Sequence, residues 1–310
     1  MKISVVMATY NGAQYIEEQL DSIRLQTMQP DEVILCDDCS SDDTVKLIKK
    51  YICDYDLRDT WKVKVNKDNL GYANNFNNAA YLATGDFIFF SDQDDLWMLD
   101  KIKIMVSIME QNSDCQVLCT DYELFCSNTN DYKLTRGILS KMPDDGKLEK
   151  ISITKRSVYI GALGCCMCVR KKFYHSIKSY WFDGWAQDDR MWRLAQCVDG
   201  CYLLHSNLVK HRLHDNNTAT YGKYHSIEKR VKLFKNMQDA NKQMLRMLTG
   251  KNRMNKESSI IQKHIKMMEL RIALLENSKI VNALILIAYL PYYQRSKSLL
   301  LELYMSIRRS

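Results

Sequence analysis

The sequence predicts an α/β fold, doubly wound around a mostly parallel central sheet, with an α-helical region after it. In the first 120 residues, short apolar runs rich in β-branched and aromatic residues alternate with segments of helical periodicity, which is typical of βα units. The chain has 310 residues, 46% of them hydrophobic, so it can bury a full core. With 3 Pro and 11 Gly it shows no flexible linker and no repeat of solenoid period.

Five strands are expected in the first part of the chain, at residues 3–8, 32–36, 61–65, 87–90 and 116–120. Between the first two, Ile16, Leu20 and Ile23 recur at helical spacing. The Ser-Ser-Asp-Asp run at 40–43 offers a capping box whose serines would cap the next helix.

The second part of the chain is less regular. Residues 122–156 are polar and weakly periodic, which predicts a long connection over the surface. A strand is expected at 164–169 and a helix at 188–197, and from about residue 225 onward the pattern is helical only.

Charge is unevenly distributed along the chain. The net charge is +7, yet residues 225–310 carry 17 Lys/Arg against 6 Asp/Glu, which leaves residues 1–224 at −4. An acidic body argues against nucleic acid as a ligand, because phosphate backbones require a basic footprint. The basic, apolar tail favours peripheral contact with an anionic membrane; packing on the body, or on a second copy in a homo-oligomer, is the alternative. The apolar run 280–290 is shorter than the roughly 20 residues of a membrane-spanning helix.

The 11 cysteines are scattered and are interpreted as reduced packing residues of a cytoplasmic protein. Cys36 and Cys39 have the spacing of a redox or zinc pair, but no second pair completes a set of four ligands. The first residues, Met-Lys-Ile-Ser-Val, do not resemble a secretion signal.

Acidic residues gather where the predicted strands end. Strand one runs into ATYNG (8–12), strand two into Asp37 and Asp38, and the 87–90 strand into SDQDDLW (91–97). Ligands of an open parallel sheet lie at this edge, so five carboxylates are expected to converge there. Such a cluster repels itself unless a cation is bound, and Mg²⁺ or Mn²⁺ suits oxygen ligands.

Together, ATYNG (8–12), CDDCSSDDT (36–44) and ATGDFIFFSDQDDLW (83–97) resemble the inverting glycosyltransferases of family 2. The bacterial rhamnosyltransferase-like branch is the most similar, and the specificity lies in the order of the motifs rather than in any single one. The resemblance implies a GT-A fold, with a Rossmann-like, mostly parallel central sheet.

The resemblance also implies a UDP- or dTDP-linked sugar donor and its binding residues. Thr9, Tyr10 and Asn11 would line the nucleobase and ribose pocket. Asp38 would accept a hydrogen bond from the base, with Asp37 the less favoured of the pair.

The acids after the 87–90 strand correspond to the family's Asp-x-Asp element. Asp94 is the first candidate for metal ligand, with Asp92 beside it, and Asp95 would hold sugar hydroxyls or support these ligands. The ion would neutralise charge on the leaving diphosphate.

Two later segments, WAQDDRMW (185–192) and HRLHDNN (211–217), resemble the acceptor side of the family. Asp188 falls where the catalytic base is expected, and Asp189 is its neighbour and competitor. Arg212 is suited to the diphosphate and His214 to the metal. A helix-end role for the acids and a structural role for His214 remain open.

The domain organisation expected is a catalytic domain at 1–222, with a donor half (1–120) and an acceptor half (121–222), and a helical basic region at 223–310. The acceptor would be a glycan, attached to a lipid if the tail meets the inner face of the plasma membrane. The alternatives are a nucleotidyltransferase that makes sugar nucleotides and a non-catalytic partner with this fold.

Overall fold

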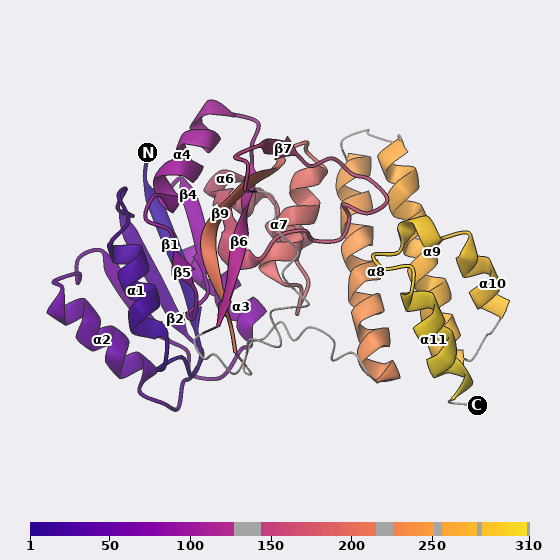
Figure 1. Ribbon diagram of the computed structural model, residues 1–310, viewed down its shortest axis with the longest axis horizontal. Coiled ribbons are helices and arrows are strands. Elements are labelled where there is room, and N and C mark those ends of the chain that lie inside the picture. Colours follow the sequence, from indigo (N-terminus) through magenta and orange to yellow (C-terminus); the bar gives the residue numbers. More distant parts are fainter. Residues whose placement is uncertain (127–143, 215–225, 251–255, 278–280, 309–310) are drawn as a thin grey trace. The chain divides into compact units, whose positions relative to one another are not determined.

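The computed structural model describes residues 1–126, 144–214, 226–250, 256–277 and 281–308 (Figure 1). They form two compact units. The first comprises Met1–Ile151, Ala162–Ala195 and Asp199–Asn217, and the second comprises Ser152–Gly161, Gln196–Val198 and Thr218–Ser310.

The first unit contains a nine-stranded sheet with the strand order β3-β2-β1-β4-β8-β6-β9-β5, and β7 also pairs with β9. The strands β1 to β4 are parallel, β8 is antiparallel to both β4 and β6, and β6 is parallel to β9. The strands are β1 (Ile3–Thr9), β2 (Glu32–Asp37), β3 (Trp61–Val65), β4 (Phe87–Ser91), β5 (Leu96–Trp97), β6 (Val117–Cys126), β7 (Leu148–Lys150), β8 (Met167–Arg170) and β9 (Cys201–Leu213).

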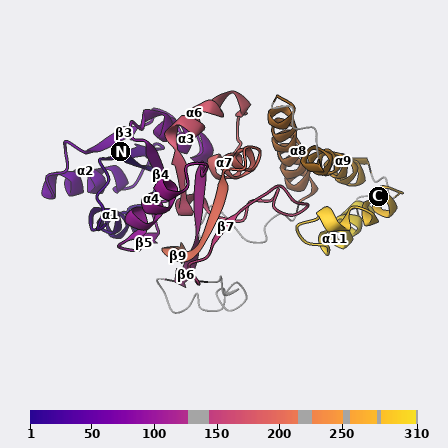
Figure 2. The ribbon, with the colours of Figure 1, turned by 90° about the horizontal axis from the view of Figure 1, so that it is seen from above.

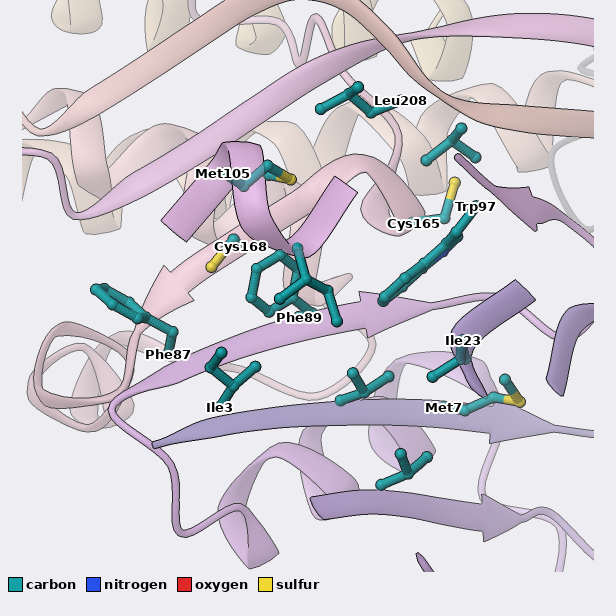
Figure 3. Packing of buried hydrophobic residues seen from close by; sticks show 14 of the residues in the cluster. Ile3, Met7, Ile23, Phe87, Phe89, Trp97, Met105, Cys165, Cys168 and Leu208 are labelled. Atoms are coloured by element: carbon teal, nitrogen blue, oxygen red, sulfur yellow. The ribbon is translucent and has the colours of Figure 1, made fainter. Parts of the chain in front are cut away.

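Alternate residues of the central strands face two separate helical layers, because successive side chains of a strand point to opposite faces. On one face, Phe87 and Phe89 join a core with side chains from α1 (Ile16–Arg24), α2 (Thr44–Asp54) and α4 (Lys101–Gln111) (Figure 3). On the other face, Phe90 lies 6.0 Å from both Phe76 and Tyr174, measured between ring centroids.

The second layer consists of α3 (Tyr72–Leu82) and α6 (Lys171–Ser176), and α7 (Gln187–Gln196) joins it through the guanidinium of Arg190, 4.7 Å above the ring of Tyr174. Strands covered on both faces have continuous apolar sequences rather than alternating ones. This explains the unbroken Phe-Ile-Phe-Phe run of β4.

The five strands predicted for the first part of the chain are confirmed, most of them a residue or more longer than expected. The prediction of a surface connection over 122–156 is wrong for the residues described, because β6 continues to Cys126 and β7 pairs with β9. The strand expected at 164–169 begins only at Met167, after a 3-10 turn at Gly164–Cys166, and the helix expected at 188–197 is α7. The sequence analysis missed β5 and β9.

The cysteine interpretation holds in part. None of the eleven cysteines, all of which the structure describes, forms a disulfide; eight are buried, but Cys39 and Cys53 are exposed. Cys39 has a φ of 70°, so it is a turn residue rather than a packing residue.

The second unit is helical where it is described, apart from short connecting segments, as expected for the C-terminal region. Its helices are α8 (Ile227–Gly250), α9 (Lys256–Asn277), α10 (Val281–Ile287) and α11 (Ser298–Ile307), with a 3-10 turn at Leu290–Tyr292. Helices α8 and α9 lie side by side in both views (Figures 1 and 2), and α10 and α11 pack on α9. Among the described helices, none combines the length and the apolar character that crossing a bilayer requires.

Candidate functional site

The candidate site lies at the carboxyl edge of the sheet, around β1. The chain leaves β1 towards β2 on one side and reaches β4 on the other, so the direction of strand order reverses here. A crevice at such a switch point is where ligands of open α/β sheets bind. The loops after β1, β2 and β4 carry the acids and polar residues singled out from the sequence.

The loops after β1 and β4 are joined by a side-chain amide. Gln93 Oε1 accepts a hydrogen bond from Tyr10 N at 2.9 Å, and Gln93 Nε2 donates one to Tyr10 O at 3.0 Å. A Cβ on Gly12 would lie 2.2 Å from Gln93 Oε1, so only glycine leaves room for this amide. The ring of Tyr10 is half exposed at the edge.

Asp37 holds the loops after β1 and β2 together. Its carboxylate accepts hydrogen bonds from Thr9 Oγ1 at 2.8 Å, Ser40 N at 2.9 Å and Ser40 Oγ at 2.6 Å. Asn11, which has a φ of 48°, donates its N–H to Ser40 Oγ at 2.8 Å. Asp37 is fully buried. Without its carboxylate, the donors of Thr9 and Ser40 would lose their hydrogen-bond acceptor.

The predicted capping box at 40–43 is wrong. Ser40 bonds to Asp37, and the N–H of Ser41 donates to Asn11 Oδ1 at 2.8 Å. The helix begins at Thr44, whose N–H donates to Asp42 Oδ1 at 3.0 Å. The serines therefore support the loop after β1 instead of capping α2.

Asp38 accepts three hydrogen bonds from the segment that follows β3. Its Oδ1 receives Asn66 Nδ2 at 3.0 Å and Leu70 N at 2.8 Å, and its Oδ2 receives Gly71 N at 2.8 Å. A carboxylate oxygen has two lone pairs, so Oδ2 retains acceptor capacity. Asp38 thus fixes the segment that follows β3 against the end of β2.

Two of the three acids after β4, Asp94 and Asp95, contact residues at and just beyond the end of β9. Asp94 Oδ2 lies 2.8 Å from His214 Nε2, and Asp95 Oδ1 lies 2.8 Å from His211 Nδ1. Arg212 donates its backbone N–H to Asp95 Oδ1 at 3.0 Å and its Nε to Asp94 O at 2.7 Å.

Arg212 also reaches α1, because its terminal nitrogen lies 2.6 Å from an oxygen of Glu18. With the Nε hydrogen bond to the Asp94 carbonyl, this contact uses at least two of the five N–H donors of the guanidinium. Asp215, Asn216 and Asn217 of the same motif lie outside the described residues.

Electrostatic repulsion is strong within this cluster. Burial, followed by the charges of Asp95 and Asp94, raises the pKa of Asp92 to about 8. Burial lowers the pKa of His211, but the hydrogen bond and the charge of Asp95 outweigh the effect of burial and raise this pKa to about 9. Asp95 and His211 therefore form a buried ion pair at neutral pH. The charge of His211 also lowers the pKa of Asp92, but burial and the neighbouring acids outweigh this effect.

Two sets of side chains in this cluster have the spacing of metal ligands. Ligand atoms of Asp95, Cys165 and His211 lie within 4.8 Å of one another. The neighbouring Cys166 and burial raise the pKa of the Cys165 thiol well above its usual range, and the pKa of His211 is raised by Asp95, so a cation there would have to displace two protons. Asp94 Oδ2 and His214 Nε2 are joined by a hydrogen bond of 2.8 Å. This spacing is close to the about 3 Å between neighbouring ligands of an octahedral ion with 2.1 Å bonds, so a cation would take the place of the shared proton.

Asp188 and Asp189, at the start of α7, have different environments. Asp189 accepts Trp185 Nε1 at 2.8 Å and forms an ion pair with the buried Arg193 at 2.7 Å. Asp188 accepts the N–H of Asp189 at 2.8 Å, and within the described part of the chain no cation pairs with it. Burial, with the charge of Asp189, raises the pKa of Asp188 to about 6.

Asp188 belongs to the same electrostatic site as the acids after β4, since its charge contributes to the raised pKa of Asp92. Gly164 makes space beside it: a Cβ at Gly164 would come within 3.6 Å of Asp188 Oδ2. All the acids predicted from the sequence thus line one edge of the first unit.

Sequence reasoning gave no role to four contributors, Glu18, Gln93, Lys101 and His211. Lys101 is completely buried, donates Nζ to Cys165 O at 2.6 Å, and has a pKa lowered to about 8 by burial. Gln93 stood inside the acidic motif and could have been noticed there. No spacing rule in the sequence pointed to Glu18 or Lys101.

Asp37→Ala tests the supporting role of this carboxylate. We expect the free energy of unfolding to fall by about 2–4 kcal/mol, because buried donors of Thr9 and Ser40 lose their acceptor. Urea denaturation of Asp37→Ala beside Asp43→Ala, an exposed acid of the same loop, measures it, and the control should stay within about 0.5 kcal/mol. Unchanged stability with lost nucleotide binding would instead make Asp37 a ligand residue.

The fold is similar to solved glycosyltransferase structures. Staphylococcus aureus TarS 1-349 in complex with UDP-GlcNAc superposes with a TM-score of 0.65 at 17% identity, covering 100% of this chain and 88% of that one. The mannosyltransferase PcManGT from Pyrobaculum calidifontis, in complex with GDP-Man and Mn²⁺, superposes with a TM-score of 0.52 at 16% identity, covering 99% and 84%. The likeness shows a GT-A type of fold.

Curated relatives match the first part of the chain. The putative glycosyltransferase EpsE of Bacillus subtilis is 34% identical over 151 residues, 48% of this chain and 52% of EpsE. The Escherichia coli β-1,3-glucosyltransferase WfgD is 32% identical over a match that covers 41% of this chain and 48% of WfgD. The dTDP-rhamnosyl transferase RfbG of Shigella flexneri is 37% identical over 35% of this chain and 39% of RfbG. The chain spans about half the length of the first two.

The model of the family named glycosyl transferase family 2 matches residues 4–176, more than half of the chain. That segment contains β1 to β4, the acids that follow these strands, and the Gly164 turn beside Asp188. This chain belongs to glycosyl transferase family 2.

Proposed function

We propose that this protein is an inverting glycosyltransferase that moves a sugar from a nucleotide diphosphate onto a hydroxyl of a glycan acceptor in cell-surface polysaccharide assembly. The observation that carries the proposal is the buried acid cluster after β4, at the switch point of the sheet, with Asp188 in its electrostatic reach. Similar chains support the polysaccharide context: one is described as a putative teichuronic acid biosynthesis glycosyltransferase, TuaG.

On the donor side, the nucleoside would lie against Thr9, Tyr10 and Asn11, and Asp38 Oδ2 would accept a hydrogen bond from the base. The half-exposed ring of Tyr10 offers a flat apolar surface for a base. UDP and dTDP both present an imide N–H, and the names of WfgD and RfbG contain one of these nucleotides each.

Asp94, Asp92 and His214 would hold Mn²⁺ or Mg²⁺. When bound, the ion would act as a Lewis acid that neutralises charge on the departing diphosphate. Arg212 would hold the Asp94 backbone in place through its Nε hydrogen bond, and Asp95 with His211 would secure the loop from behind. In this proposal, Arg212 acts on the diphosphate through that loop.

Asp188 would be the catalytic base. Direct displacement with inversion needs one carboxylate on the acceptor side to take the hydroxyl proton as the new C–O bond forms. Asp189 is less suited, because its carboxylate is engaged by Arg193 and Trp185. The raised pKa of Asp188 makes it a stronger base than an ordinary aspartate.

The pair Asp188→Asn and Asp189→Asn separates the two acids. We expect Asp188→Asn to lower kcat for sugar transfer by about 10²–10⁴-fold with unchanged stability, and Asp189→Asn chiefly to lower stability, since it breaks a partly buried ion pair. Steady-state transfer assays with a panel of nucleotide sugars, beside thermal unfolding, measure both. Undiminished transfer by Asp188→Asn would move the base to Asp189.

The pH profile gives a further expectation for Asp188. The base works only when deprotonated, so kcat/KM should be level above pH 6 and fall tenfold per pH unit below about 6. Transfer rates between pH 4.5 and 8 at saturating Mn²⁺ would show this limb. The residual activity of Asp188→Asn should lack it, and a limb that persists in this variant would assign the titration to another group.

Metal dependence is tested on Asp94. We expect Asp94→Ala and a chelator each to reduce transfer by at least about 10²-fold, because several kcal/mol of barrier depend on the ion. Titration of Mn²⁺ binding by calorimetry gives a readout independent of turnover, with the exposed Asp59→Ala as control. Turnover that survives both treatments would contradict the metal assignment.

A further inference from the structure

Helices α10 and α11 of the second unit carry large apolar side chains on their outer surfaces. Among the described residues, 18 large hydrophobic side chains are at least 40% exposed, and eight of them lie within 281–307. We call these eight the outer apolar face, with exposures from 43 to 70%: Val281, Leu284, Ile285, Ile287, Leu300, Leu301, Tyr304 and Ile307. Apolar residues this dense on a surface mark an interaction site.

In α11 the usual amphipathic arrangement is inverted. The buried positions of this helix are Leu299, Glu302 and Ser306, so two of the three are polar. Its exposed positions include Leu300, Leu301, Tyr304 and Ile307. A helix of a water-surrounded protein normally places its apolar stripe on the core.

A buried ion pair fixes this orientation. Glu302 is fully buried and accepts Arg271 Nε at 3.0 Å and the terminal Arg271 nitrogen at 2.5 Å, while Arg230 lies 3.5 Å away. Ser306 Oγ donates to Leu274 O at 2.9 Å. Turning α11 to bury its leucines would leave Arg271 buried without its partner, which is strongly unfavourable. The outward leucines are therefore built into the fold.

Charge indicates what covers the outer apolar face. Residues 278–310 contain five Lys/Arg and one acid, Glu302, which the ion pair removes from the surface. Arg295, Lys297 and Arg308 are exposed beside the face. A second copy would bring like charges together, whereas an anionic lipid surface complements both the positive charge and the apolar side chains.

We propose that the outer apolar face of α10 and α11 binds the surface of an anionic lipid bilayer, with both helices lying in the interfacial plane. Neither of these two helices is long and apolar enough to cross a bilayer. The purpose of this binding rests on the proposed function: a bilayer would bring the enzyme to a lipid-linked acceptor. The binding itself is measurable without any substrate.

The experiment is sedimentation of the full chain with vesicles of phosphatidylcholine alone or with 30 mol% phosphatidylglycerol. We expect at least tenfold stronger partitioning into the anionic vesicles, weakened by salt. Leu300→Ser/Ile307→Ser on α11, and Leu284→Ser/Ile287→Ser on α10, should each weaken it about tenfold or more. Arg295→Gln/Lys297→Gln should weaken it by roughly fivefold per charge.

Matched controls are chosen in the first unit. Leu25→Ser/Leu82→Ser and Lys46→Gln/Lys49→Gln change equally exposed residues and should leave partitioning unchanged. Circular dichroism confirms that each variant is folded. Asp188→Asn should strongly reduce transfer and still bind vesicles, so the proposed function and the membrane proposal can be contradicted independently of each other.

Two results would overturn the inference. One is partitioning that is absent in the folded wild type or equal in all variants. The other is concentration-dependent self-association without lipid, detected by sedimentation velocity and removed by Leu300→Ser/Ile307→Ser, which would make the face an interface between copies. Transfer to a water-soluble acceptor without vesicle binding would overturn this inference alone.

Discussion

The buried pair of Asp95 and His211 is the interaction on which the site depends. It joins the loop after β4 to the end of β9, so it connects the parallel half of the sheet to its mixed half at the edge where ligands bind. With His211 protonated, the pair neutralises one of three crowded acids. The same contact places Arg212 and His214 against Asp94, because they follow His211 along β9 and just beyond it. Together with the contacts that Arg212 and His214 make to the same loop, it opposes the mutual repulsion of these acids.

Adjacent acids in this protein have separate tasks. Asp37 accepts hydrogen bonds from Thr9 and Ser40, in the loops after β1 and β2, whereas its neighbour Asp38 accepts them from Asn66, Leu70 and Gly71 after β3. Asp189 is held by Arg193, whereas Asp188 has no cation partner among the described residues. The two carboxylates of each pair therefore contact different parts of the protein.

Local pattern was sufficient to predict the parallel half of the sheet and its acids. The runs of β1, β2 and β4 are continuous and apolar because helices cover both faces, and acids that follow such strands must lie at one edge. The pattern failed at β9, where Ser206, Asn207 and Lys210 interrupt the apolar residues and the register with β6 shifts near Asp121. It also failed at Ser40 and Ser41, where hydrogen bonds to Asp37 and Asn11 outweighed local capping propensity. Asp37 is a local partner, three residues before Ser40, whereas Asn11 is 29 and 30 residues from the two serines. A partner as distant as Asn11 has no signature in sequence spacing.

The side-chain amide of Gln93 has a consequence for regulation. It forms hydrogen bonds with both the N–H and the carbonyl of Tyr10, and the neighbours of Gln93 in the sequence are Asp92 and Asp94. A shift of the peptide at Tyr10 is therefore transmitted to the carboxylates through a single rigid linkage. Any ligand that orders one loop lowers the entropy cost of ordering the other, and thermodynamic reciprocity requires the effect to be equal in both directions. Ligands that bind to the two loops would therefore bind cooperatively.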